Sequence, residues 1–310
     1  MSQTLQKIEF IKKKYIFYHG SDYKLPYFVP LRTVPSEKRI YIKKNNEVPS
    51  NIWFALGIRG AGKSSFLEYL GELYIRCGVS VIDIFGSRDG EGLAWLRSPW
   101  AKVLNILILH SPALRIQTYW KNIRVIPYSR FSHAMTEEYD LIISAAPLYT
   151  SMKEEYDAIN YIIDRLFERK QWKRPAYMLV REAARLLYSR IRAYKDQVVA
   201  KAQYISLIRE FRHMGISMGL DTQKFTSVDL DVRTQVDYLV IKNLGNHKLP
   251  DDLRWIYAFI SPEALISLEP QEYIILSRTG LLGTGIFPYP KWHKRPGEDI
   301  MEYVPLVIKN

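Results

Sequence analysis

Cysteine is almost absent from this sequence, which has one, Cys77, among 310 residues. A single thiol excludes an internal disulfide framework and a cysteine-rich zinc site. No apolar run approaches the ~18 residues that a membrane-spanning helix needs, so we expect no membrane segment. The basic residues Lys12, Lys13 and Lys14 are not followed by an apolar stretch, and we therefore expect no signal peptide. These absences favour a cytoplasmic protein.

Acidic residues are scarce in two segments, and this explains the formal net charge of +12. Residues 1–50 carry ten Lys and Arg against four acids (+6), and residues 165–201 carry eleven against three (+8), so the rest of the chain is nearly neutral. Localised positive charge favours a polyanionic partner, most often nucleic acid. A solvated basic face that serves solubility is the alternative.

The clearest motif is the segment 57–65, which fits the phosphate-binding pattern G-x-x-x-x-G-K-[ST] at every required position. Its glycines let successive backbone N–H groups turn towards phosphate oxygens. Lys63 adds a positive charge for the β and γ phosphates, and the Ser64 hydroxyl is suited to ligate Mg²⁺. We therefore predict that ATP and Mg²⁺ are the cofactors. The predicted nucleotide-binding residues are Gly57, Gly60, Ala61, Gly62, Lys63, Ser64 and Ser65.

The segments around this loop alternate between strand-like and helical patterns. Residues 52–56 form an apolar run typical of a buried strand, and residues 64–76 have apolar side chains at helical spacing. The alternation continues, with strands expected near 79–86, 105–109, 123–126, 140–145, 176–180, 216–220, 238–242 and 273–276, and helices near 153–170 and 197–214. The pattern predicts a doubly wound α/β fold with a mostly parallel sheet.

The chain divides into three parts in this interpretation. Residues 1–50 mix short β-like runs, at 15–18 and 39–42, with four prolines, and they form a basic, partly β N-terminal region. Residues 51–290 form the domain that contains the phosphate-binding loop, or P-loop. Residues 291–310, within the segment after Phe287 that is rich in Pro and Lys, are expected to form a C-terminal tail.

A hydrolytic P-loop enzyme needs a carboxylate near magnesium and a group that orients the attacking water. Glu182 follows the apolar strand at 176–180 and is the predicted catalytic base; the alternative is a helix N-terminal acid. The residue before it is Arg181, where most such enzymes have the magnesium-associated aspartate. A guanidinium cannot bind a cation and can contact only phosphate or another carboxylate.

Asp83 is the rival carboxylate, because it also ends an apolar run. Residues 83–86 match the D-x-x-G pattern of GTPases, although the match is short. The chain lacks a downstream Asn-Lys-x-Asp motif for guanine. A GTPase or small-molecule kinase built around Asp83 is therefore the least favoured alternative.

Two further residues complete the predicted catalytic set. Gln223 follows a strand at the position where a polar side chain can sense the γ-phosphate, although it could be an ordinary strand terminus. Arg212 lies on the preceding helix and could reach a neighbouring subunit's γ-phosphate as an arginine finger. Arg209 and Arg233 are other candidates for that role. Alternatively, Arg212 is an ordinary arginine that faces solvent or DNA.

Together these motifs resemble the FtsK–HerA superfamily of DNA-pumping P-loop ATPases. The matching features, in order, are the loop at 57–65, Asp83, the segment 181–186 for D-E-A-x-x-L, the segment 212–215 for R-x-x-G, Thr222-Gln223, and the segment 268–273. Only the phosphate-binding loop is specific alone. The main departure is Arg181, and Gln271 also replaces a glycine.

The resemblance implies a RecA/ASCE-type domain that hydrolyses ATP as a homo-oligomeric ring, six subunits in the family, and moves double-stranded DNA through a basic channel. The compact chain favours a virus or mobile element, and so the cytoplasm of a cell that carries one. Glu182, Gln223 and Arg212 would be catalytic, and Ser64 would be the metal ligand. The alternative is a nucleotide-gated DNA-binding or assembly module with little turnover, because Arg181 replaces the aspartate.

Overall fold

The computed structural model describes residues 28–32, 37–43, 47–85, 89–168, 172–188, 195–258, 260–280 and 282–309. The predicted β-like run at residues 15–18 and most of the basic N-terminal region lie outside the described residues. None of the described helices is both long and apolar enough to cross a membrane.

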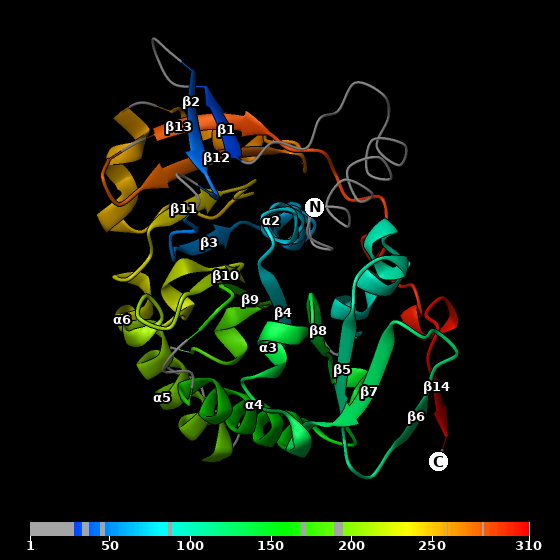
Figure 1. Ribbon diagram of the computed structural model, residues 1–310. Helices are drawn as coiled ribbons and strands as arrows, with labels where there is room; N and C mark the ends of the chain where they lie inside the picture. Colours follow the sequence, from blue (N-terminus) through cyan, green and yellow to red (C-terminus); the bar gives the residue numbers. More distant parts are fainter. Residues whose placement is uncertain are drawn as a thin grey trace.

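A twelve-stranded sheet organises the described chain, in the order β2-β1-β13-β12-β11-β3-β10-β9-β4-β8-β5-β7 (Figure 1). Neighbouring strands from β11 to β7 are parallel, whereas β12, β13, β1 and β2 pair in antiparallel fashion at one end. The strands of the sheet are β1 (Phe28–Arg32), β2 (Glu37–Tyr41), β3 (Ile52–Leu56), β4 (Ser80–Ile84), β5 (Ile106–His110), β7 (Ile123–Pro127), β8 (Leu141–Ser144), β9 (Ala176–Val180), β10 (Ile216–Thr222), β11 (Tyr238–Ile241), β12 (Glu272–Ser277) and β13 (Leu282–Ile286). The predicted α/β class and mostly parallel sheet are confirmed.

The helices cover both faces of this sheet. Those among the described residues are α2 (Lys63–Arg76), α3 (Met135–Glu138), α4 (Met152–Phe167), α5 (Lys195–Glu210), α6 (Leu230–Arg233) and α7 (Pro262–Ile266). One apolar core joins the sheet to α4 and α5, which pack against each other, and a second core joins the other face to α2. Strands such as β3 and β9 are buried along their whole length, which is why they read as continuous apolar runs.

Local sequence explains where the main helices begin and end. The first turn of α4 follows Ser151, whose hydroxyl accepts the Glu154 backbone N–H, as in a Ser-x-x-Glu capping box. α2 ends at Cys77 and Gly78, and Gly78 has φ +83°, a left-handed conformation that favours glycine. Both helices begin and end within a few residues of the predicted bounds.

The two ends of the described chain pack onto the central domain. β1 and β2 extend the main sheet beyond β13, and Val29 and Ile40 are buried in the α2-side core. Near the C-terminus, Trp292 and Ile300 are buried in the same core. Residues 291–310, predicted as a tail, also supply β14 (Val307–Lys309), which pairs with β6 (Arg115–Gln117) as Figure 1 shows.

Candidate nucleotide-binding site

The phosphate-binding loop connects β3 to α2 and has the conformation that its glycines predict. Gly60 and Gly62 have φ +77° and +80°. A Cβ added at Gly62 would lie 2.3 Å from the Pro270 carbonyl oxygen, and one at Gly57 would lie 2.8 Å from the Lys242 Cβ. Gly57 and Gly62 therefore have no room for a side chain, whereas at Gly60 the conformation alone selects glycine.

Lys63 begins α2, and its Nζ donates a hydrogen bond of 2.8 Å to the Ile58 carbonyl oxygen of the same loop. Burial lowers the pKa of this ammonium group, and the negative charges of Asp221, Glu91 and Glu182 partly oppose that shift. These three carboxylates therefore favour the charged form of Lys63. A phosphate group can replace a loop carbonyl as the acceptor, because an ammonium group bonds more strongly to an anion.

The Ser64 hydroxyl donates a hydrogen bond of 2.9 Å to Asp221 Oδ2, from a residue 157 positions away in the chain. Asp221 lies near the end of β10, which is adjacent to β3, and it aligns with Ala55. Its second oxygen accepts the Glu182 backbone N–H at 2.5 Å. Sequence reasoning missed Asp221, although the apolar run 216–220 that ends in an aspartate was visible.

Glu182 lies two residues after the end of β9, next to Arg181, and it adopts a left-handed conformation with φ 48° and ψ 50°. Non-glycine residues seldom adopt this conformation, which is found most often at functional sites and turns. Its side chain remains 44% exposed, with Arg185 Nη1 at 3.9 Å from Oε2. Burial, followed by the charge of Asp221, raises the pKa of Glu182. A raised pKa suits a carboxylate that accepts a proton.

Gln223 comes directly after β10 and is exposed at the same edge of the sheet. It lines a cavity of about 220 Å³ together with Leu56, the last residue of β3, and Lys248. The structure therefore places Gln223 beside the end of the strand that leads into the phosphate-binding loop. Its role as a γ-phosphate sensor stays a prediction.

Arg212 does not lie at this edge. Arg212 lies between α5 and β10, and its Nη2 is 2.8 Å from Asp237 Oδ1. The Asp237 carboxylate also accepts the backbone N–H of Ile52, at the start of β3. The amino ends of β3 and β10 are therefore near Arg212, and the phosphate-binding loop is at their carboxyl ends. Arg209 forms an exposed pair with Asp231. Arg233 donates to the Val228 carbonyl oxygen.

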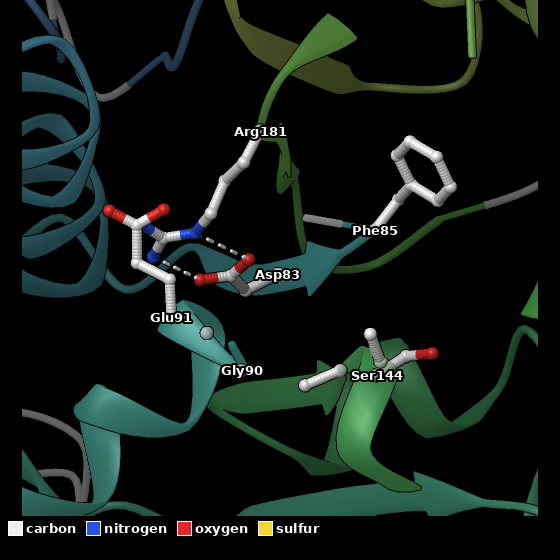
Figure 2. Close-up of a pocket in the computed structure, with 9 residues that line it drawn as sticks. Asp83, Phe85, Gly90, Glu91, Ser144 and Arg181 are labelled. Atoms are coloured by element: carbon white, nitrogen blue, oxygen red, sulfur yellow. Dashed lines mark hydrogen bonds and ion pairs between the residues drawn. The ribbon is translucent and has the colours of Figure 1, made fainter. Parts of the chain in front are cut away.

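Arg181 is fully buried, and its guanidinium contacts Asp83 on β4 and Glu68 on α2. Figure 2 shows its guanidinium between Asp83 and Glu91. It donates to both oxygens of Asp83, at 3.3 and 2.7 Å, and to Glu68 Oε1 at 2.9 Å, while Glu91 Oε2 lies at 3.5 Å. Although burial opposes the charged form, the carboxylates hold the pKa of Arg181 well above its usual value. The prediction that this arginine must contact carboxylate or phosphate is confirmed for carboxylate.

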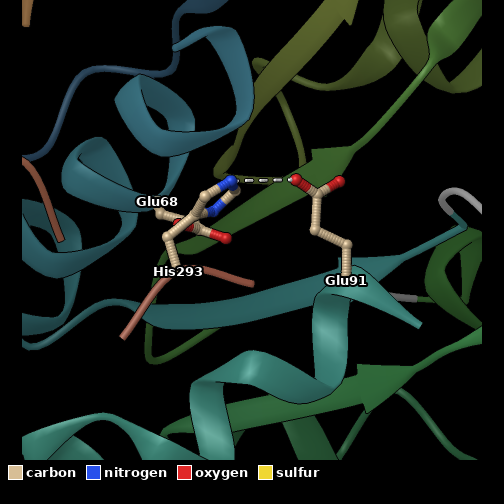
Figure 3. A group of neighbouring side chains, drawn as sticks. All are labelled: Glu68, Glu91 and His293. Atoms are coloured by element: carbon tan, nitrogen blue, oxygen red, sulfur yellow. Dashed lines mark hydrogen bonds and ion pairs between the residues drawn. The ribbon is translucent and has the colours of Figure 1, made fainter. Parts of the chain in front are cut away.

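His293 completes this group, which we call the arginine cluster: Arg181, Asp83, Glu68, Glu91 and His293. Figure 3 shows the imidazole between Glu68 and Glu91. Its Nδ1 is 2.8 Å from Glu68 Oε2, and its Nε2 is 3.5 Å from Glu91 Oε1. Burial alone would lower the pKa of His293, but the charge and hydrogen bond of Glu68 raise it. The geometry of Glu68, Glu91 and His293 could hold a metal ion, but Arg181 and His293 already neutralise these acids.

Magnesium is the cation that the P-loop pattern implies, and the residues around Ser64 suit it. Mg²⁺ prefers hard oxygen ligands and is usually bound through few protein groups together with substrate phosphates. A serine hydroxyl that bonds to a buried carboxylate offers this chemistry. Ser64 is therefore the side chain that would hold Mg²⁺ beside a bound nucleotide.

Comparisons with known proteins give similarity only at a low level. No family model matches the sequence, and no curated protein matches it. The genome packaging NTPase B204 of Sulfolobus turreted icosahedral virus 2, in complex with ATP-gammaS, aligns with 79% of this chain and 100% of its own at 15% identity and a TM-score of 0.43.

Two other solved structures align over similar lengths. The pCW3 conjugation coupling protein TcpA aligns with 89% of this chain and 70% of its own (15% identity, TM-score 0.44). Thermomonospora curvata EccC, ATPases 2 and 3, aligns with 85% of this chain and 40% of its own (11% identity, TM-score 0.47). Similarity at this level does not establish a shared activity, so the functional assignment depends on this chain's own residues.

Proposed function

We propose that this chain is a subunit of an ATP-driven DNA translocase, of the type that packages or transfers double-stranded DNA, and that it hydrolyses ATP within a homo-oligomeric ring. The observation that carries the ATPase part is the convergence of Lys63, Ser64 and Glu182 at the carboxyl edge of the sheet, next to a loop with the required glycine geometry. Nucleotide binding at such a strand edge is the general rule for open α/β sheets.

Each residue of this edge has a distinct task in the proposal. The loop N–H groups and Lys63 bind the β and γ phosphates, and Ser64 holds Mg²⁺, which would neutralise charge on the transferring phosphoryl group. Glu182 orients the attacking water and accepts its proton, in agreement with its raised pKa. Gln223 contacts the γ-phosphate or the water.

The position of Arg212 is compatible with the ring part of the proposal. It lies at the amino ends of β3 and β10, so it cannot reach the phosphate loop of its own chain, at the other ends of these strands. A contact with γ-phosphate would therefore have to involve another subunit. The resemblance puts the number of subunits at six.

DNA binding has weaker support in the described residues than in the sequence. Of the six basic side chains of the segment 165–201 that the structure describes, five are within ion-pair distance of carboxylates: Arg165, Arg174, Arg181, Arg185 and Lys201. Such pairs reduce the positive charge that is free to meet phosphate. The DNA part of the proposal thus depends on the motifs and on the overall charge.

The test is the rate of ATP hydrolysis with and without double-stranded DNA, measured together with the particle mass. We expect DNA to stimulate hydrolysis and moderate salt to weaken that stimulation. Lys63→Ala should abolish hydrolysis, and Glu182→Gln should lower kcat by about 10²- to 10⁴-fold, the usual contribution of a general base. Hydrolysis unaffected by Glu182→Gln would exclude the role of that residue.

Mixed rings test whether Arg212 acts between subunits. Arg212→Ala and Glu182→Gln should each inactivate a pure ring, but mixing the two proteins should restore part of the activity, because some sites then combine an intact Glu182 with an intact Arg212. Mixing Glu182→Gln with Lys63→Ala should restore much less, since both residues act within one chain and no subunit of that mixture has an intact site. Arg209→Ala tests the alternative residue for this role: a pure Arg209→Ala ring should stay active if Arg212 is the arginine finger.

The second candidate is a nucleotide-gated DNA-binding or assembly module with little turnover. The observation that favours it is Arg181, which occupies the position of the magnesium-associated aspartate and is fully engaged elsewhere. In this case ATP would promote oligomerisation without release of phosphate. Steady-state turnover would rule it out.

A further inference from the structure

The arginine at position 181 leaves the proposed ATPase without a magnesium-associated acid at the end of β9. Asp83 is the acid that the sequence offers instead. Both of its oxygens accept N–H groups of Arg181, and Oδ2 also accepts the Trp95 indole N–H at 2.8 Å. Its buried charge is therefore neutralised within the protein, and it has no need of a metal ion.

Asp221 differs from Asp83 in the partners of its charge. It is 2% exposed, and its hydrogen-bond donors are the neutral Ser64 hydroxyl and the Glu182 backbone N–H. Among the described residues, no Lys, Arg or His nitrogen lies within ion-pair distance of this carboxylate, and the charge of Lys63 acts on it from beyond that distance. A buried carboxylate without a cation is costly, so such groups usually pair with a positive charge or coordinate metal.

The position of Asp221 in the sheet brings this unpaired charge to the phosphate-binding loop. Leu220 pairs with Val180 in the β10–β9 register, so Asp221 and Arg181 follow at equivalent places on adjacent strands. Val180 and Leu220 face the α4 and α5 core, and side chains alternate along a strand, so residues 181 and 221 face α2. From that face, Arg181 turns towards β4, and Asp221 turns towards Ser64 in the first turn of α2.

We propose that Asp221 supplies the carboxylate of the Mg²⁺ site, a role that has moved from the end of β9 to the end of the neighbouring strand β10. The inference rests on the proposed nucleotide-binding function and adds a residue to it. Asp221 fixes the Ser64 hydroxyl for the ion and provides the negative charge that the ion requires. The same carboxylate bonds the backbone of Glu182, so it links the metal to the position of the proposed base.

The direct test measures binding of ATPγS in the presence of EDTA and in the presence of Mg²⁺ by titration calorimetry. In the wild-type protein Mg²⁺ should tighten binding. Asp221→Asn keeps the size of the side chain and an oxygen acceptor but removes the charge. We expect the variant to bind ATPγS normally in EDTA and to lose most of the effect of Mg²⁺, with the affinity for Mn²⁺ in the ATPγS complex, followed by paramagnetic resonance, reduced by about 10- to 100-fold.

Asp237→Asn is the matched control. Asp237 also accepts a backbone N–H at a strand end, from Ile52 at 2.9 Å, but it lies at the opposite edge of the sheet. The Asp237→Asn variant should still bind ATPγS more tightly in Mg²⁺ than in EDTA, as the wild-type protein does. If Asp221→Asn keeps the full Mg²⁺ effect, the inference is wrong while ATP binding stands. If the wild-type protein binds no ATPγS under either condition, the proposed function itself fails.

A structure of the wild-type protein with ATPγS and Mg²⁺ decides the question even if the variant does not fold. The inference requires the Asp221 carboxylate to contact Ser64 and the ion or one of its waters. An ion whose only protein carboxylate is Asp83 or Glu182 would overturn it.

Discussion

Two groups of acids lie on the α2 face of the same sheet, and they are neutralised in different ways. In the arginine cluster, Asp83, Glu68 and Glu91 surround the chain's own cation, Arg181, and His293 adds a second basic group. At the phosphate-binding edge, the donors to Asp221 within the described part of the chain are a hydroxyl and a backbone N–H. The first group is balanced by basic side chains of the chain itself. Asp221 has no described basic group within ion-pair distance, and we propose that it binds a cation from solution. The partners of a buried carboxylate therefore indicate its role better than its position in a sequence motif.

The largest expected effect is a difference in the free energy of unfolding between variants of the two groups. Arg181→Met preserves an apolar stem but leaves three buried carboxylates without their guanidinium. Loss of one partner of a buried ion pair costs about 3–5 kcal/mol in the free energy of unfolding. Asp221→Asn should change it by less than about 1 kcal/mol, because the amide oxygen can still accept the Glu182 backbone N–H and the Ser64 hydroxyl can turn to accept an amide N–H. Chemical denaturation of both variants measures the difference.

The double variant Arg181→Met with Asp83→Asn sharpens this comparison. It removes one of the unpaired charges, so it should recover part of the stability that Arg181→Met loses. Equal stability of Arg181→Met and the wild-type protein would contradict the assignment of the arginine cluster as an internally balanced group.

An intermediate effect is expected in the phosphate-binding loop. Gly62→Ala combines a left-handed backbone with a Cβ that would lie 2.3 Å from the Pro270 carbonyl oxygen, and it should cost about 3 kcal/mol and weaken binding of ATPγS. Gly60→Ala is the matched control, because Gly60 has a similar φ, +77°, and no atom within 4 Å of the added Cβ. It should cost about 1 kcal/mol. Equal losses of stability would show that contact with Pro270 does not matter.

The smallest expected effect concerns pH and applies to the arginine cluster alone. The pKa of His293 is raised by Glu68, so the protonated form stabilises the folded protein. This contribution is complete below the pKa of histidine in the unfolded chain and is lost as the pH rises through the raised folded value. His293→Gln should therefore cost about 1 kcal/mol near pH 6 and less near pH 9. Thermal unfolding at both pH values measures this difference, and a cost that grows with pH would contradict it.

Much of the fold follows from local patterns in the chain. The buried parallel strands β3, β9 and β10 read as apolar runs, and α4 and α5 have clear helical spacing. Other features depend on partners that are distant in the sequence. β6 has three residues and β13 contains two glycines, and neither strand was predicted. The antiparallel pairing of β12 with β11 depends on the path of the chain between the two strands, which no local pattern specifies. The buried state of Trp292, in a segment rich in proline and lysine, depends on its contacts with the α2 side of the core.

The candidate site divides in the same way. The sequence by itself determined the phosphate-binding loop, because its glycines, Lys63 and Ser64 act through backbone conformation and neighbours within a few residues. Only the tertiary structure decided which acid meets Ser64, because Asp221 is brought there by the order of β3, β10 and β9 in the sheet. It also decided that Arg181 faces Asp83 and that the carboxylate beside Ser64 comes from the next strand. Strand order sets these distances, and no local pattern encodes it.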